Sequence, residues 1–401
     1  MVYLDNAATT CVDQTAINII TNSLHEDYIN PSALYNQGRD NFQIIQDCKK
    51  NILHNLGLLK YNNNIYFTSG GCEGNNWVIK GCVAEYYRYC RNEGLIENFT
   101  QTIKKPHIIT SVFEHHSVLN ACKQLEKLNI AKVTYIKPDP TTGVINPKDI
   151  KKSMSTYYDD YKTILVSIMW INNVLGTIQP IKEIGQICKK HLVKFHTDAV
   201  QAIGNIHIDL SQYDIDFMTV SGHKFHAPKG IGFVYIKDSK YIQPMISGGG
   251  QEYGFRAGTE NLPYIKAITY CFEKYNNIKY IDYKFNYIER LKGELIKGCS
   301  EISDSIYFIS SDGIGTFNIA FKNLISDMLV YNLGERGYMV SVGSACDNGN
   351  FENSHVLTAV DYSQEYINGN IRITFNTYNT YDEIKDFIQV LKDEIIKMRG
   401  Y

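Results

Sequence analysis

Residues Val220–Ile236 have the sequence VSGHKFHAPKGIGFVYI, in which Lys224 lies between a polar turn and a glycine-rich β segment. Burial lowers the pKa of a lysine amine, and the free amine can then form a Schiff base with an aldehyde. Ser221 and His223 place hydrogen-bond donors for a phosphate beside this amine. An isolated segment of this kind is more often a surface turn, so its interpretation depends on the rest of the chain.

The composition of the 401 residues, 44% hydrophobic and 20% charged, is typical of a soluble protein of about two domains. The net charge of −2, without a basic block, argues against binding to nucleic acid or a membrane surface through bulk charge. The ten cysteines form no C-x-x-C pair, so we expect no zinc or other metal site. Scattered cysteines, no signal peptide and no membrane-length apolar run together favour the cytoplasm.

Strands and helices alternate at short spacing through most of the chain. A short strand begins at Tyr3, and apolar segments predict further strands at 65–69, 106–110, 132–136, 163–170, 193–197 and 215–221. Helical periodicity predicts helices at 38–56, 77–90, 121–128, 148–158 and 181–191. The alternation predicts a parallel α/β sheet, with ligands at the carboxyl ends of its strands.

A phosphate-binding pattern follows the first of these apolar strands. The strand at 65–69 leads into GGCEGNN (70–76) and then into a helix. Free backbone N–H groups and the positive end of the helix dipole would point at an anion there. The pattern is weak by itself, because many turns in α/β proteins resemble it.

The pattern changes after Ser247-Gly248-Gly249-Gly250-Gln251. We expect helices at 262–275, 286–297, 324–334 and 381–398, and strands at 305–310, 316–320, 338–342 and 370–375. This is typical of a smaller α+β domain. We therefore predict a large α/β domain over 14–256, and a small domain formed by 1–13 and 257–401.

Nine segments, in order, resemble the cysteine desulfurases of the NifS/IscS type, within the class V aminotransferase group of fold-type I pyridoxal phosphate (PLP) enzymes. They are YLDNAATT, FTSGGCEGNN, EHHSVLN, NNVLGTIQPI, HTDAVQAIG, SGHKFHAPKGIG, GGGQEYGFRAGTEN, SVGSACDNGNFENSHVL and NIRITF. The resemblance extends from Tyr3 to Phe375. It implies a PLP-dependent transferase fold of type I, whose large domain contains a mostly parallel sheet of the seven-stranded type.

The resemblance also implies residue roles around the cofactor. Lys224 matches the lysine that binds PLP, Asp198 matches the carboxylate facing the pyridine nitrogen, and His115 matches the imidazole stacked on the ring. Further cofactor contacts fall on Gly71, Cys72, Gln201, Ser221, His223 and, across a dimer interface, Thr259. Without the other motifs, the ordinary explanation for Asp198 would be that it follows a strand and caps the next helix.

Asn173 and Arg372 match the site for the substrate carboxylate, which an arginine fork can bind bidentately. Cys346, in the polar segment GSACDNGNFENS, matches the nucleophile that would take sulfur from L-cysteine as a persulfide and leave L-alanine. Most intracellular thiols are instead buried and inert. The resemblance further implies a homodimer and a sulfur acceptor such as an iron–sulfur scaffold protein.

The chain departs from the family pattern at Cys72, Tyr35, Tyr253 and Asn376. Three other functions stay open. The same fold and cofactor would also suit a selenocysteine lyase or a class V aminotransferase without desulfuration, and Cys72, Tyr35 and Tyr253 leave open a sulfur-transfer scaffold of the same fold with weak or no turnover. The colour of the purified protein, together with release of alanine and sulfide from cysteine, would distinguish an enzyme from a scaffold.

Overall fold

The computed structural model describes residues 1–58, 64–95, 103–156, 160–302, 311–343, 354–362 and 364–400. The strands are β1 (Val2–Tyr3), β2 (Ile65–Thr68), β3 (Lys105–Ser111), β4 (Lys132–Ile136), β5 (Tyr161–Ser167), β6 (Lys194–Asp198), β7 (Phe217–Ser221), β8 (Gly232–Ile236), β9 (Thr316–Ala320), β10 (Tyr338–Met339), β11 (Ser341–Val342) and β12 (Asn370–Thr374). The α-helices are α1 (Gln14–Glu26), α2 (Asn36–Asn55), α3 (Gly71–Asn92), α4 (His116–Lys127), α5 (Pro147–Thr156), α6 (Ile181–Lys190), α7 (Leu262–Tyr275), α8 (Ile278–Cys299), α9 (Ser326–Glu335), α10 (His355–Ala359), α11 (Gln364–Ile367) and α12 (Tyr381–Met398).

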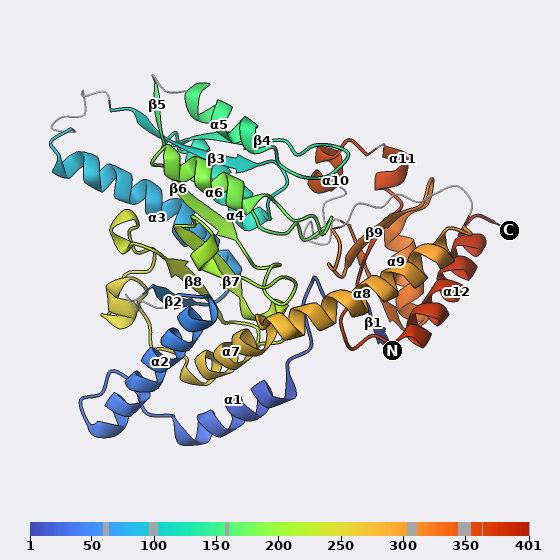
Figure 1. The fold of residues 1–401 in the computed structure, drawn as a ribbon, viewed down its shortest axis with the longest axis horizontal. Helices are drawn as coiled ribbons and strands as arrows, with labels where there is room; N and C mark the ends of the chain where they lie inside the picture. Colours follow the sequence, from blue (N-terminus) through green and yellow to red (C-terminus); the bar gives the residue numbers. More distant parts are fainter. Residues whose placement is uncertain are drawn as a thin grey trace.

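The larger sheet has seven strands in the order β2-β8-β7-β6-β5-β3-β4. The pairs from β7 through β6, β5 and β3 to β4 are parallel, and β8 is antiparallel to both of its neighbours. The predicted mostly parallel α/β sheet is therefore confirmed, with one reversed strand. Its parallel strands end together, so the residues that follow β3, β5, β6 and β7 meet at one edge (Figure 1).

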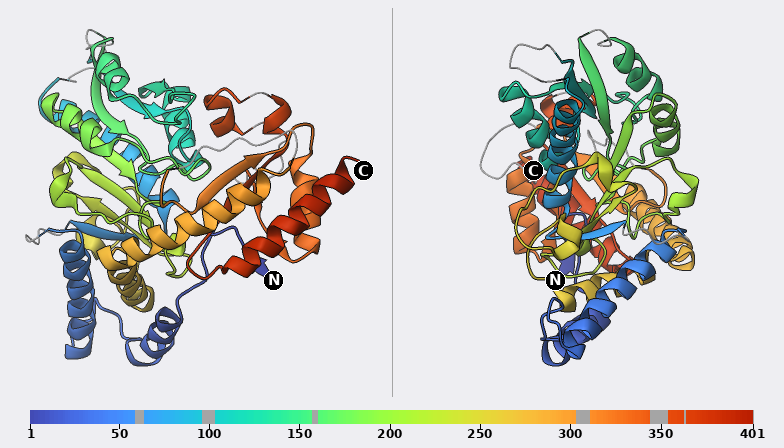
Figure 2. Two further views of the ribbon diagram at one scale, coloured as in Figure 1. Left: turned by 45° about the vertical axis from the view of Figure 1, so that its right-hand side comes forward. Right: turned by 90° about the vertical axis from the view of Figure 1, so that its left-hand side faces the viewer.

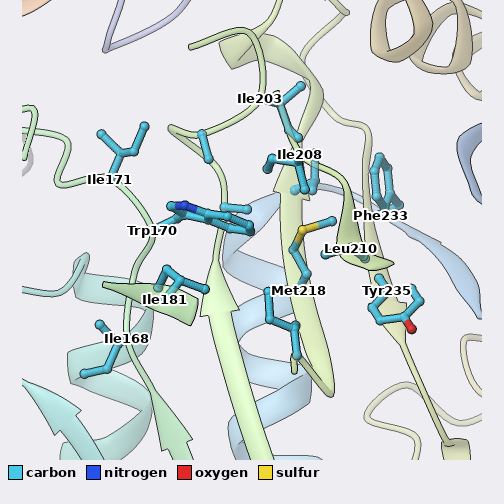
Figure 3. Packing of buried hydrophobic residues seen from close by; sticks show 14 of the residues in the cluster. Ile168, Trp170, Ile171, Ile181, Ile203, Ile208, Leu210, Met218, Phe233 and Tyr235 are labelled. Carbon is cyan, nitrogen blue, oxygen red and sulfur yellow. The ribbon is translucent and has the colours of Figure 1, made fainter. Parts of the chain in front are cut away.

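Helices cover both faces of this sheet, and successive strand residues belong to different cores. Phe217 and Val234 pack with α3 and α4 on one face, whereas Met218 and Phe233 pack with α2, α5, α6 and α7 on the other. This is why the strands are continuously apolar in sequence. Figure 3 shows part of the second core, around Trp170.

A smaller sheet, in the order β11-β12-β9, is antiparallel and packs against α8, α9 and α12. Leu4 from the N-terminal segment is fully buried in the same core. Figure 2 shows the N-terminus beside α12, although the two lie at opposite ends of the sequence. The N-terminal segment therefore contributes to the core beside the small sheet.

Helices α7 and α8 pack in different cores. The buried residues of α7, among them Ile265 and Phe272, belong to the core of the seven-stranded sheet, whereas Ile288 and Leu291 of α8 belong to the small core. Figure 1 shows α8 running from one half of the molecule to the other. We therefore propose that the boundary lies in α8 rather than at 256/257.

Four predicted elements, β4, α7, β9 and α12, have the bounds expected from the sequence. The predicted strand 338–342 instead forms two strands, because β10 pairs with β1 and β11 pairs with β12. The 13-residue helix α1 and the short helices α10 and α11 are not predicted by the sequence patterns, and the expected strand 305–310 lies outside the described residues. Among the described residues, no helix has both the length and the hydropathy that crossing a membrane requires.

Candidate active site

A cavity of about 290 Å³ lies where the strands of the large sheet end. Most of the residues predicted for the site line it, although they come from six separate parts of the chain. Its lining contains Gly71, Cys72, His115, Asn173, Asp198, Gln201, Ser221, His223, Lys224 and Arg372, together with Ala7, Ala8, Asn75, Ser117, Met169, Ile171 and Val200. The fold thus brings ten predicted residues to one place.

The N-terminus of α3 forms one wall of the cavity. The helix begins at Gly71, six residues before the predicted start at Trp77, so the glycines belong to its first turn and cap rather than to a loop. The cap residue Gly70 has φ 146° and ψ −169°, a conformation open only to glycine. A Cβ on Gly71 would approach Val200 Cγ2 to 2.8 Å, so glycine keeps the backbone close to the sheet. The first-turn N–H groups and the helix dipole favour an anion here.

Lys224 follows β7, at the end of the short 3₁₀ helix Gly222–Lys224. Its Nζ donates hydrogen bonds to the carbonyl oxygens of Ala7 (2.6 Å) and Ala8 (2.8 Å). Gln201 Nε2 donates to the same Ala7 oxygen at 2.9 Å. The N-terminal segment therefore orients both the amine and the amide toward the cavity.

His223 lies beside this amine and is largely removed from solvent. Burial, and then the charges of Lys224 and Lys229, lower the pKa of His223 to about 4. Near neutral pH the imidazole is therefore neutral. It can offer a hydrogen bond to an anion without adding a full charge.

Asp198 is the last residue of β6 and is 5% exposed. Its Oδ1 accepts from the backbone N–H of Val200 at 2.9 Å, and its Oδ2 accepts from Asn75 Nδ2 at 2.7 Å. Two directed donors therefore fix the carboxylate in the cavity wall. The structure confirms that Asp198 ends a strand, but its partners come from other elements as well.

His115 is the N-cap of α4, and its Nδ1 accepts from the Ser117 backbone N–H at 3.1 Å. Burial lowers the pKa of His115, while the nearby Asp198 carboxylate opposes this and the charges of Lys224 and His116 add to it. The neighbouring His116 stacks obliquely on His355, with ring centroids 4.7 Å apart. Only His115 of the two adjacent histidines lines the cavity.

Arg372 lies on β12, the middle strand of the small sheet, and is 2% exposed. Its Nη1 donates to Asn173 O at 3.0 Å, and its Nη2 forms an ion pair with Asp5 Oδ1 at 2.8 Å. Arg372 Nε and Asn173 Oδ1 are buried and have no hydrogen-bond partner among the described residues. Both atoms lie on residues of the cavity wall, so the site has polar capacity left for a ligand.

Two predicted site residues are not part of this cavity as the structure describes it. Thr259 is exposed and does not belong to the lining, although Arg256 nearby forms an ion pair with Glu73 of α3 at 2.9 Å. Cys346 lies outside the described residues. Of the other cysteines, Cys72 is exposed at the cavity and Cys11 is exposed elsewhere, whereas six are buried.

Three of the residues that depart from the family pattern lie away from the cavity, and the structure shows their contacts or exposure. Asn376 is buried, and its Nδ2 lies 3.0 Å from Nε2 of His226, two residues after Lys224. Tyr253 is in the left-handed region with φ 57°, and its hydroxyl donates to Gln46 at 2.7 Å. Tyr35 is 58% exposed at the N-cap of α2. None of these three side chains lines the cavity.

The sequence did not point to the residues that support the site. Asp5, Asn75 and Ser117 each contact a predicted residue, but in the sequence they carry no signal beyond their place inside longer motifs. Glu114, fully buried beside His115, accepts from Ser111 Oγ at 2.6 Å, and burial raises the pKa of its carboxyl to about 8. The only feature of the sequence that could have indicated these four residues is that each lies inside one of the nine family-like segments.

Comparison with known proteins gives a consistent result. Residues 2–387 match the family model described as Aminotransferase class-V. The chain is 36% identical over 401 residues to "Cysteine desulfurase IscS" of Methanosarcina thermophila, covering 100% of this chain and 93% of that protein. It is 35% identical to the protein of the same name from Dictyoglomus turgidum, covering 99% and 95%.

Solved structures agree with these relatives. A structure described as "NIFS-LIKE PROTEIN" superposes with a TM-score of 0.85 at 31% identity, covering 98% of this chain and 99% of that one. A second, described as "SspA in complex with cysteine", has a TM-score of 0.77 at 30% identity, covering 95% and 100%. The shared fold includes both the large and the small sheet regions, since the coverage is nearly complete.

Proposed function

Because the chain belongs to the aminotransferase class V family, we propose that it is a PLP-dependent cysteine desulfurase that uses the cavity at Lys224. Full-length relatives named cysteine desulfurase support the reaction, and the structural relative solved with cysteine supports the substrate. The observation that carries the residue assignment is that Lys224, Asp198, His115 and Arg372 line one cavity. Such a constellation has little use in a purely structural protein.

The residues present fit PLP. The N-terminus of α3 with Ser221 and His223 would hold the phosphate, Lys224 would hold the aldehyde carbon, and Asp198 would face the pyridine nitrogen. The close approach of Gly71 to Val200 supports this, because a side chain at Gly71 would fill the cradle. When bound, PLP withdraws electrons from the substrate and so weakens the bonds at its Cα.

The chain's own groups then have separate tasks. Arg372, with Asn173 beside it, would bind the carboxylate of cysteine, since a guanidinium fork matches a carboxylate. His115 would hold a proton over the reacting atoms, and its lowered pKa favours the neutral imidazole near pH 7. Asp198 would keep a negative charge next to the ring nitrogen, so that the ring stays a good electron acceptor.

Cys346 would take the sulfur. Its thiolate attacks the sulfur of the bound cysteine, a new S–S bond forms, and the C–S bond breaks with its electron pair left on the substrate carbon. A proton at that carbon completes alanine, and Cys346 is left as a persulfide. The persulfide would pass to an acceptor such as an iron–sulfur scaffold protein. The homodimer with Thr259 at the neighbouring site, and a cytoplasmic location, stay predictions.

Covalent labelling tests the central assignment. Borohydride reduction of the purified protein, followed by peptide mapping, should place the cofactor on the Lys224 peptide, and Lys224→Ala should lose both the label and alanine production. Lys229→Ala, a change at an exposed lysine five residues away, is the matched control. A label on Lys229, or a colourless protein that releases neither alanine nor sulfide, would refute the proposal in favour of a scaffold. Release of alanine from selenocysteine but not from cysteine would identify a lyase.

A further inference from the structure

Asn75 connects two groups of the site that lie far apart in the sequence. Its Nδ2 donates to Asp198 Oδ2 at 2.7 Å and to Ser117 Oγ at 2.8 Å. An amide nitrogen has two hydrogens, so these two bonds use its whole donor capacity. Asn75 is 1% exposed, and its Oδ1 has no hydrogen-bond partner among the described residues. Burial of an unpaired carbonyl costs free energy, so the two bonds to Nδ2 hold the amide in this orientation against that cost.

The hydrogen-bond donors of Ser117 determine which nitrogen of the neutral His115 imidazole carries the hydrogen. The Ser117 backbone N–H donates to His115 Nδ1 at 3.1 Å, which requires a lone pair on that nitrogen. Ser117 Oγ lies 2.8 Å from the same Nδ1 and already accepts from Asn75, so its own hydrogen is available for Nδ1. A neutral imidazole with a lone pair on Nδ1 has its hydrogen on Nε2.

We propose that Asn75 and Ser117 are positioning residues, which together hold His115 as the Nε2–H tautomer and link it to Asp198. The inference rests on the proposed function, because it concerns the residues that would face the cofactor. The Nδ1–H tautomer would lose the hydrogen bond from the Ser117 backbone, because Nδ1 would no longer offer a lone pair, and its contact with the Ser117 hydroxyl would have to reverse direction. It would also leave the N-cap of α4 unsatisfied, which usually destabilises a helix.

The assignment has a chemical consequence. A histidine with its hydrogen on Nε2 donates a hydrogen bond at Nε2 and cannot accept a proton there unless the tautomer changes. His115 in this form therefore stabilises negative charge near Nε2. It acts as a base at Nε2 only after a proton is moved to Nδ1, which costs the hydrogen bond from the Ser117 backbone. Asn75 makes that change harder, since its N–H directs the Ser117 hydroxyl hydrogen toward Nδ1.

Nitrogen NMR of the full chain labelled with ¹⁵N-histidine tests the proposal, with His115→Gln to assign the resonances. In the native protein, with and without cofactor, Nε2 of His115 should carry the hydrogen and Nδ1 should not. Ser117→Ala and Asn75→Ala should shift the Nδ1 resonance or produce a mixture of tautomers. Ser117→Thr, which keeps the hydroxyl, should restore the native pattern.

Ser167→Ala is the matched control, because Ser167 Oγ lies 2.8 Å from Nδ1 of another buried histidine, His196, outside the site. Ser117→Ala should lower kcat about fivefold with an unchanged KM, as expected for one hydrogen bond, whereas Ser167→Ala should leave kcat unchanged. A native His115 with its hydrogen on Nδ1, or a Ser117→Ala protein with native resonances and native kcat, would overturn the proposal. The tautomer is measured without turnover, so a failure of the proposed function would leave this result readable.

Discussion

Replacement of Arg372 by lysine should weaken the use of cysteine without disturbing the cofactor. Lysine keeps the positive charge but offers a point charge in place of a planar fork. Arg372 reaches the site from the middle strand of the small sheet, whereas the proposed phosphate site lies at the N-terminus of α3. The change therefore separates substrate binding from cofactor binding.

The magnitude follows from the hydrogen bonds at stake. Arg372 already gives Nη1 to Asn173 and Nη2 to Asp5, and its Nε has no partner among the described residues. Loss of one charge-assisted hydrogen bond to the substrate carboxylate costs about 1.5–3 kcal/mol. At about 1.4 kcal/mol per tenfold, kcat/KM for cysteine should fall about 10- to 150-fold.

Initial rates of alanine formation measure this effect, and the absorbance of the bound cofactor shows whether the site is intact. Cysteamine, which has no carboxylate, should inhibit the native protein and Arg372→Lys equally well. Arg336→Lys, at a half-exposed arginine paired with Glu394, is the control for the substitution itself. A kcat/KM within twofold of native, or an equal loss of affinity for cysteamine, would refute the assignment of Arg372 to the carboxylate.

Three further predictions concern other parts of the molecule. Cys346→Ser should bind PLP and cysteine but lose several orders of magnitude in alanine formation, whereas Cys11→Ser, at another thiol, should retain it; equal rates would exclude Cys346 as the nucleophile. Burial lowers the pKa of Lys284 to about 7, so the folded state binds fewer protons than the unfolded state above pH 7, and stability should rise between about pH 7 and 10. This rise in melting temperature should disappear in Lys284→Met, and an unchanged pH dependence would contradict it. If Thr259 completes the neighbouring site, sedimentation should find an active dimer, and an active monomer would disprove this.

Much of the fold was predictable because local patterns were strong. Helix α7 has an Asn261 cap and Pro263 at its start, and α12 has a complete capping box from Thr380 to Glu383, so their bounds could be placed from sequence. Helix α1 has only two fully buried residues, Ala16 and Ser23, and its packed face is completed by the partly buried Ile19 and Ile20, so its apolar stripe is short. Residues 338–342 have the sequence pattern of a single strand. They form two strands because β10 pairs with β1 whereas β11 pairs with β12, and the positions of β1 and β12 are set by the tertiary structure.

The sequence by itself predicted the chemical groups of the proposed site: Lys224 as the amine, Asp198 as the carboxylate, His115 as the imidazole and Arg372 as the guanidinium. This was possible because each group belongs to a residue type with one functional group and lies inside one of the ordered motifs. Only the tertiary structure decided how these groups are held, because their partners lie far away in the chain. Asn75 and Asp198 are 123 residues apart, and Arg372 and Asp5 are 367 residues apart. Such pairs exist only once the parallel strands end at one edge and the N-terminal segment joins the small sheet, and a hydrogen bond that depends on this geometry leaves no local pattern in the sequence.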